Sequence, residues 1–176
     1  MRFTRILTLA SVVLVGCGSS GSGDSESTTA ETAVDASDAC IFLSPADFSD
    51  VGFTADGEGE DVSENFTLFT TSSVACQWTT SDDNIGSSWE LIIGRGEAKA
   101  AYDFELAFAQ QDTITTLDLV DEAFLVDKVS SFDSADHDFE VAVRRGDTFF
   151  TLSTTDDRGA DAIVALATLV ANQLAA

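Results

Sequence analysis

Three cysteines and a single histidine are the residues of this sequence best suited to covalent or metal chemistry. Cys17 lies near the amino end, and Cys40 and Cys76 enclose a segment of about 37 residues. A thiol can accept a lipid, bond to a second cysteine or bind zinc. A zinc site takes about four ligands, and His137 is the only histidine in the chain. A disulfide, two free buried thiols and half of a metal site are therefore the alternatives for Cys40 and Cys76.

Acidic side chains offer the other candidate chemistry. His137 lies in the segment DSADHD at 133–138, whose carboxylates could hold Ca²⁺, but the spacing and glycine of an EF-hand are missing. A solvated loop between two strands explains the segment equally well. Glu105 interrupts the apolar arc of a predicted helix, and a buried carboxylate there would need a partner. An arc that is only partly covered, or a pairing with Arg144 or Arg145, would also explain Glu105.

The signatures of common active sites are missing from the sequence. It has no Gly-x-Ser-x-Gly nucleophile elbow, no Gly-rich phosphate loop and no Cys-x-x-Cys. Acidic pairs such as Asp82-Asp83 and Asp156-Asp157 are expected to be turn and capping residues. We therefore predict no catalytic residue, no metal ligand and no cofactor.

The charge of the chain argues against one class of partner. The formal net charge of the chain is −23. Beyond Arg2 and Arg5 the net charge is −25, because this part contains six Lys and Arg but 31 Asp and Glu. A surface of this sign repels phosphate backbones and anionic headgroups. We predict no nucleic-acid partner. Solubility in a salty medium, loose cation binding and a cationic partner are all compatible with the charge.

The first residues have the pattern of an export signal. Arg2 and Arg5 precede an apolar run of about ten residues at 6–15, half of the roughly 20 that a membrane-spanning helix needs. The run ends in Leu-Val-Gly-Cys at 14–17, which resembles the lipobox of bacterial lipoproteins. In that family the cysteine, here Cys17, carries a diacylglycerol, and two acyl chains anchor a protein stably. An ordinary secretory leader with a chance cysteine is the alternative.

We predict that residues 1–16 are a signal peptide and that Cys17 anchors the chain on the extracytoplasmic face of a membrane. Residues 17–39 are small, polar and acidic, with no aromatic residue, so they are expected to form a flexible tether. A tether of this length reaches about 25 Å. Export would place Cys40 and Cys76 in an oxidising compartment, which favours a disulfide between them.

Residues 40–176 are expected to form one domain of strands and helices. A short helix is expected from Pro45, with Ser44 as its cap, and longer helices over 97–111 and about 158–175. Strands are expected where apolar and polar residues alternate, over 66–71, 74–80, 89–94, 121–126, 139–144 and 148–154. These elements predict an α+β fold, a mostly antiparallel sheet of five or six strands packed by the two longer helices.

Four short motifs occur in an order that resembles a known family. They are CIFLSP at 40–45, ACQW at 75–78, DEAF at 121–124 and VRRGDT at 143–148, followed by an apolar helix. Actinobacterial lipoproteins with a domain of unknown function have a lipobox, a Ser/Thr-rich tether, a Cys-x-Leu-Leu-Thr-Pro opening, a Cys-x-Trp strand and a Gly-Asp-Glu-Ala segment. The opening here differs from theirs, and Val120 replaces the glycine. The resemblance implies a disulfide between the two domain cysteines and implies no activity.

Together these observations predict a lipid-anchored lipoprotein of unknown molecular function. It would act as a binding or accessory module of the cell envelope, with an envelope protein or a small ligand as its partner. Two alternatives remain open. One is a small hydrolase using acidic residues, with Glu105 or His137 involved, which a deep cleft at either residue would favour. The other is a single-lobe substrate-capture component of a transporter.

Overall fold

The structure, a computed structural model, describes residues 38–66, 68, 70–82, 85–109, 113–129 and 137–174. The predicted signal peptide, Cys17 and nearly all of the predicted tether lie outside these ranges, as does most of the acidic segment 133–138. The described residues all belong to one compact unit.

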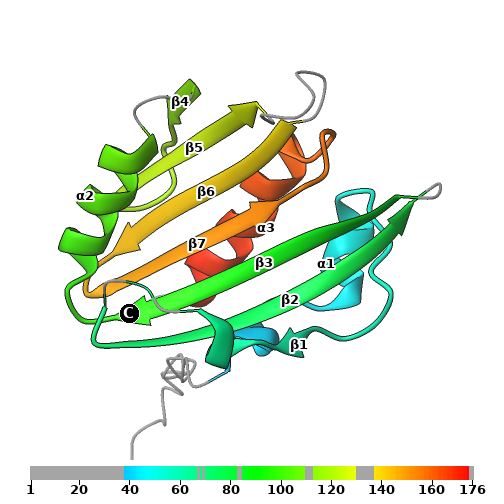
Figure 1. The fold of residues 1–176 in the computed structure, drawn as a ribbon, viewed down its shortest axis with the longest axis horizontal. Helices are drawn as coiled ribbons and strands as arrows, with labels where there is room; N and C mark the ends of the chain where they lie inside the picture. Colours follow the sequence, from blue (N-terminus) through cyan, green and yellow to red (C-terminus); the bar gives the residue numbers. More distant parts are fainter. Residues whose placement is uncertain are drawn as a thin grey trace, which may run out of the picture. The chain divides into compact units, whose positions relative to one another are not determined.

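A single sheet joins all the strands, and every pair of neighbours in it is antiparallel. The strand order is β1-β2-β3-β7-β6-β5-β4 (Figure 1). The strands are β1 (Glu60–Asp61), β2 (Ser72–Asp82), β3 (Ile85–Arg95), β4 (Thr113–Thr116), β5 (Glu122–Val129), β6 (His137–Arg145) and β7 (Thr148–Thr154). The predicted α+β class and the antiparallel pairing are confirmed. The sheet has seven strands, however, rather than five or six.

In the described part of the chain, three α-helices and two short 3-10 helices accompany the sheet. They are η1 (Ala39–Phe42), α1 (Pro45–Asp50), η2 (Ser63–Asn65), α2 (Ala98–Phe108) and α3 (Ala160–Gln173). Helix α1 begins as its sequence predicts, with Pro45 at the first position and the Ser44 backbone N–H donating to the Asp47 carboxylate at 2.7 Å. All three α-helices lie within a few residues of their predicted ranges.

The helices cover opposite faces of the sheet. In Figure 1, α2 lies in front of β5, β6 and β7, whereas α1 and α3 lie behind the sheet. The rear face carries the larger core, in which Trp78, Trp89, Val141 and Leu152 pack against Phe48 of α1 and Ile163 of α3. The front core is smaller and centres on Tyr102 of α2, whose ring meets Phe124 and Phe149 edge to face. Among the described elements, no α-helix covers the front of β2 and β3.

Two edge strands and one incorrectly predicted strand explain the difference in strand count. Strands β1 and β4 have two and four residues. Because β4 reads TITT, with one apolar residue, alternation could not reveal it. The strand predicted at 66–71 is wrong, since none of its described residues belongs to a strand. Leu68 instead packs on the front core, and Thr70 lies against Gly94 of β3 so closely that any side chain at Gly94 would collide with it. The segment therefore crosses the front of the sheet.

Candidate functional site

A polar groove lies on the front face of the sheet, at the β3, β7 and β6 strands. The register aligns Glu90 of β3 with Ser153 of β7, and Ser153 with Glu140 of β6. These three residues form one row across the sheet, and residues in such a row point to the same face. The next residues on this face, two positions along each strand, are Ser88, Thr155 and Asp138, and all six line the groove.

The groove has a volume of about 240 Å³. It is smaller than the sites of about 300–1,000 Å³ that hold drug-sized ligands. Because its floor is made of paired strands, the positions of the side chains that line it are set by the sheet. The size and the rigid floor suit a small polar molecule.

Some charged groups in the groove have an ion-pair partner and others do not. The Lys128 ammonium, from β5, lies 2.8 Å from the Glu140 carboxylate. Glu90, which is half-buried, has neither a hydrogen bond nor an ion pair with the rest of the described chain. Burial raises the pKa of Glu90, and the nearby charge of Glu140 raises this pKa further. The half-buried Glu90 carboxylate therefore has no compensating charge within the described chain.

Glu105 of α2 lies above the same part of the sheet. It is half-buried on the side of the helix that also carries Ala98 and Tyr102. Burial raises its pKa, the charge of Glu140 adds to this effect, and Lys128 opposes it. Glu105 does not line the groove, but it adds a negative charge beside it.

The proposed pairing of Glu105 with Arg144 or Arg145 is wrong. Arg144 binds the Glu122 carboxylate, and Arg145 donates to the Ala171 carbonyl. The apolar arc of α2 is instead only partly covered, since Phe104 and Phe108 are exposed and stack on one another. Glu105 lies where the covered part of the arc ends.

The raised pKa values predict how Glu90→Gln and Glu105→Gln change stability. At neutral pH the folded state bears the cost of a charged, half-buried carboxylate, so each substitution is expected to raise the melting temperature. The gain should be largest above the folded-state pKa. It should vanish as the pH falls below the 4.5 of the unfolded chain, where the carboxyl is protonated in both states. Melting curves at pH 7 and pH 4 measure this, with the exposed Glu60→Gln as the matched control; equal gains in all three variants would contradict it.

His137 lies on the rear face, away from the groove. It shares this face with Phe139 and Val141, because alternate residues of β6 point the same way. Its Nδ1 atom is 2.6 Å from an Asp127 carboxylate oxygen, and its ring stacks on Phe139. His137 and Glu105, each named as a candidate for a hydrolase, therefore lie on opposite faces of the sheet.

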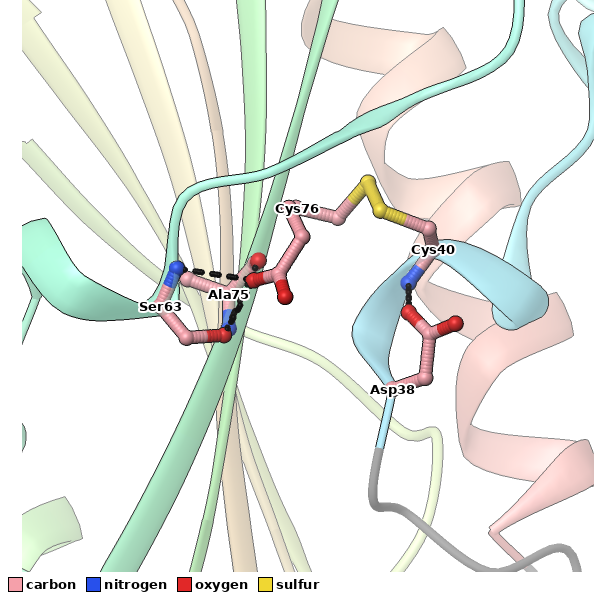
Figure 2. The surroundings of a disulfide bond; sticks show 6 residues. Asp38, Cys40, Ser63, Ala75 and Cys76 are labelled. Atoms are coloured by element: carbon pink, nitrogen blue, oxygen red, sulfur yellow. Dashed lines mark hydrogen bonds between the residues drawn. A yellow bond between two sulfur atoms is a disulfide. The ribbon is translucent and has the colours of Figure 1, made fainter.

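The two domain cysteines form a disulfide at the edge of the rear core. Cys40 of η1 and Cys76 of β2 are bonded with an S–S distance of 2.02 Å. Figure 2 shows the bond between the two elements. The Cys40 N–H donates to the Asp38 carboxylate at 2.8 Å, and the Ala75 N–H donates to the Ser63 hydroxyl at 2.8 Å (Figure 2). These contacts join the start of the described chain to the sheet.

Asp156 is a buried carboxylate that the structure uses to hold the loop before α3. It is 5 % exposed and accepts hydrogen bonds from Arg158 and from the Ser87 hydroxyl, at 2.9 and 3.0 Å. The bond from Arg158 is the main cause that lowers the pKa of Asp156. The predicted turn role is observed here, because Asp156 accepts from the Arg158 backbone N–H two residues on, whereas the cap of α3 is Gly159 and receives no side-chain hydrogen bond.

Asp156→Asn is expected to destabilise the domain by about 1–3 kcal/mol at pH 7, because a charged acceptor of hydrogen bonds is lost. The folded-state pKa lies below the unfolded value of 3.8, so the contribution of Asp156 is present above that value and is lost as the pH falls through the folded-state pKa. Urea unfolding at pH 7 and pH 3 measures the difference. The exposed neighbour Asp157→Asn is the control, and a loss in Asp156→Asn that stays constant with pH would refute the role of the charge.

The groove residues were not among the sequence candidates. Glu90, Glu140 and Ser153 each appear in the sequence as the outward-facing polar residue of a strand, which is typical of a solvated face. Only the register across three strands brings them together. Cys17 lies outside the described residues.

Other kinds of site are not found in the described part of the chain. It contains no group of three or more His, Cys, Asp or Glu side chains that could hold a metal ion. Within the same ranges, no helix has the length and apolarity needed to cross a membrane. Comparison of the chain with protein-family models, with curated proteins and with solved structures finds no match.

Proposed function

We propose that this protein is a membrane-anchored lipoprotein that presents a ligand-binding domain outside the cytoplasm. A lipid on Cys17 holds the chain at the membrane, and the tether separates the domain from the headgroups. The domain binds a small polar ligand in the groove of the front face and serves as an accessory module of the cell envelope. Capture of a substrate for a transporter is one use of such a module.

The groove is the observation that carries the binding function. A half-buried carboxylate without a partner lowers stability, as at Glu90, and such groups occur where function requires them. Among the described elements, no α-helix covers the front of β2 and β3 beside the groove. A rigid floor on paired strands is the kind of support that a binding site needs.

Features outside the groove support the location. The lipobox-like sequence before Cys17 is typical of exported, lipidated chains. A disulfide between Cys40 and Cys76 would persist in an oxidising compartment and is rare in the cytosol. The order of short motifs that resembles the actinobacterial lipoproteins agrees with this location.

The binding function is tested by mapping weak ligands on the lipidated full-length protein in lipid nanodiscs. A library of small polar fragments, spanning anions, cations and neutral polyols, is added, and chemical-shift changes are followed by NMR. We expect hits of at least one class to move the resonances of Ser88, Ser153 and Thr155. Hits that cluster elsewhere, or no hits at all, would refute the groove as a binding site.

A further inference from the structure

We propose that the groove binds a small organic cation, such as a primary amine or a quaternary ammonium compound. This inference deepens the proposed binding function and rests on it. It follows from the arrangement of charged and hydroxyl groups around Glu90, and from the lack of a metal-binding cluster in the described residues.

The row formed by Glu90, Ser153 and Glu140 has a carboxylate at each end and a hydroxyl in the middle. Neighbouring strands lie about 4.8 Å apart, so the two glutamate backbones are about 10 Å from one another. A cationic head over Ser153 would lie between the two carboxylates. It would offset the mutual repulsion that the structure leaves between them.

The charge balance of the groove excludes an anionic ligand. Its lining holds three carboxylates, on Glu90, Asp138 and Glu140, against the one ammonium of Lys128. The Lys128 ammonium forms an ion pair with the Glu140 carboxylate at 2.8 Å. In the β5–β6 register, Lys128 also lies opposite Asp138. An anion would meet a net negative site, whereas a cation would supply the charge that Glu90 lacks.

Two hydroxyl groups of the groove, on Ser88 and Thr155, are held in position before a ligand arrives. The Gln77 side-chain amide donates to the Ser88 hydroxyl at 2.7 Å. The Ser88 backbone N–H donates to the Thr155 hydroxyl at 3.1 Å. Each of these oxygens keeps a further lone pair, which can accept an N–H of an ammonium group. Fixed acceptors reduce the entropy that a ligand must overcome.

The ligand is an organic cation rather than a metal ion. Metal ions need several oxygen or nitrogen ligands at short range, about six or more for Ca²⁺. The three carboxylates that line the groove do not form a group that could hold a metal ion, and no such group occurs elsewhere in the described ranges. The groove, of about 240 Å³, instead has room for a small organic molecule.

The test uses titrations of the lipidated protein in nanodiscs of zwitterionic lipid, at physiological salt to screen diffuse attraction. The probes are 1,4-diaminobutane and choline, with glucose, acetate and Ca²⁺ for comparison. We expect at least one of the two cations to bind and to shift the Ser153 resonance. Glu90→Gln should weaken this binding at least tenfold, and the matched charge change Glu60→Gln, on the exposed β1 strand, should alter it less than twofold.

Several outcomes would overturn the inference. One is equal weakening by Glu90→Gln and Glu60→Gln, which would mean attraction to the overall charge. Another is binding of Ca²⁺, acetate or glucose in the groove in preference to both cations, which would leave the proposed binding function standing. If no class of fragment binds in the groove, both the cation inference and the proposed binding function are refuted. A melting curve of Glu90→Gln shows that the variant is folded.

Discussion

Cys17→Ala is expected to release the protein from the membrane almost completely. Transfer of each acyl CH₂ into lipid contributes about 0.8 kcal/mol, and two chains together hold a protein far more tightly than one. Without them nothing of comparable strength remains, because the chain beyond the leader carries a charge of −25 and is repelled by anionic headgroups. We expect the membrane-bound fraction to fall more than about 100-fold.

Fractionation of cells, followed by mass spectrometry of the amino-terminal peptide, measures this release. The control is Cys40→Ala/Cys76→Ala, which removes the other two cysteines and should leave the protein on the membrane. If Cys17→Ala stays membrane-bound and gains no solubility, the anchor assignment is wrong. Recovery of the wild-type chain with its leader uncut and no fatty acid attached would also show that the anchor assignment is wrong.

Loss of the disulfide is expected to lower the stability of the domain by about 3.5–4 kcal/mol. The bond closes a loop with a sequence separation of 36, and opening that loop enlarges the conformational freedom of the unfolded chain. It also ties η1, which carries the buried Phe42, to the fully buried Cys76 of β2. For a domain of this size, the loss corresponds to a fall of about 10–20 °C in melting temperature.

The measurement compares melting curves of the wild type and of Cys40→Ala/Cys76→Ala, each with and without a reducing agent. Reduction should bring the wild type close to the double variant and should leave the variant itself unchanged. Cys17→Ala is the matched control for loss of a thiol and should melt like the wild type. A double variant less than about 1 kcal/mol below the wild type would show that the bond contributes little.

In the groove, the residue that favours ligand binding is expected to lower the stability of the domain. Glu90→Gln is expected to stabilise the domain and at the same time to weaken cation binding. Such a trade-off is common where an active or binding site holds a group in an unfavourable setting. The charge of Asp156 has the opposite effect on stability, because Arg158 and Ser87 donate hydrogen bonds to its carboxylate. The half-buried Glu90 and the buried Asp156 thus differ in role, because only the Asp156 carboxylate has partners.

Much of the secondary structure follows from the sequence alone. In β2, Val74, Cys76 and Trp78 alternate with polar or small residues and all contact the rear core, as their spacing predicts. In α3, Ile163, Leu166 and Val170 recur at helical spacing and are fully buried. These patterns are local, because the side chain of each residue points in a direction set by its neighbours in the chain. Local periodicity is therefore sufficient to identify these elements and their inward faces.

Only the tertiary structure decided the rest. The four residues of β4 form a strand because β5 offers them backbone partners, whereas the described residues of 66–71, with a better strand pattern, belong to no strand. The groove arises in the same way, since Glu90 and Ser153 are 63 positions apart and meet only through the β3–β7 register. Pairing between distant segments depends on the energy of the whole sheet, which no local pattern records. The regular spacing of apolar residues in the sequence thus determined these strands and helices. The tertiary fold determined which of their polar residues lie next to one another.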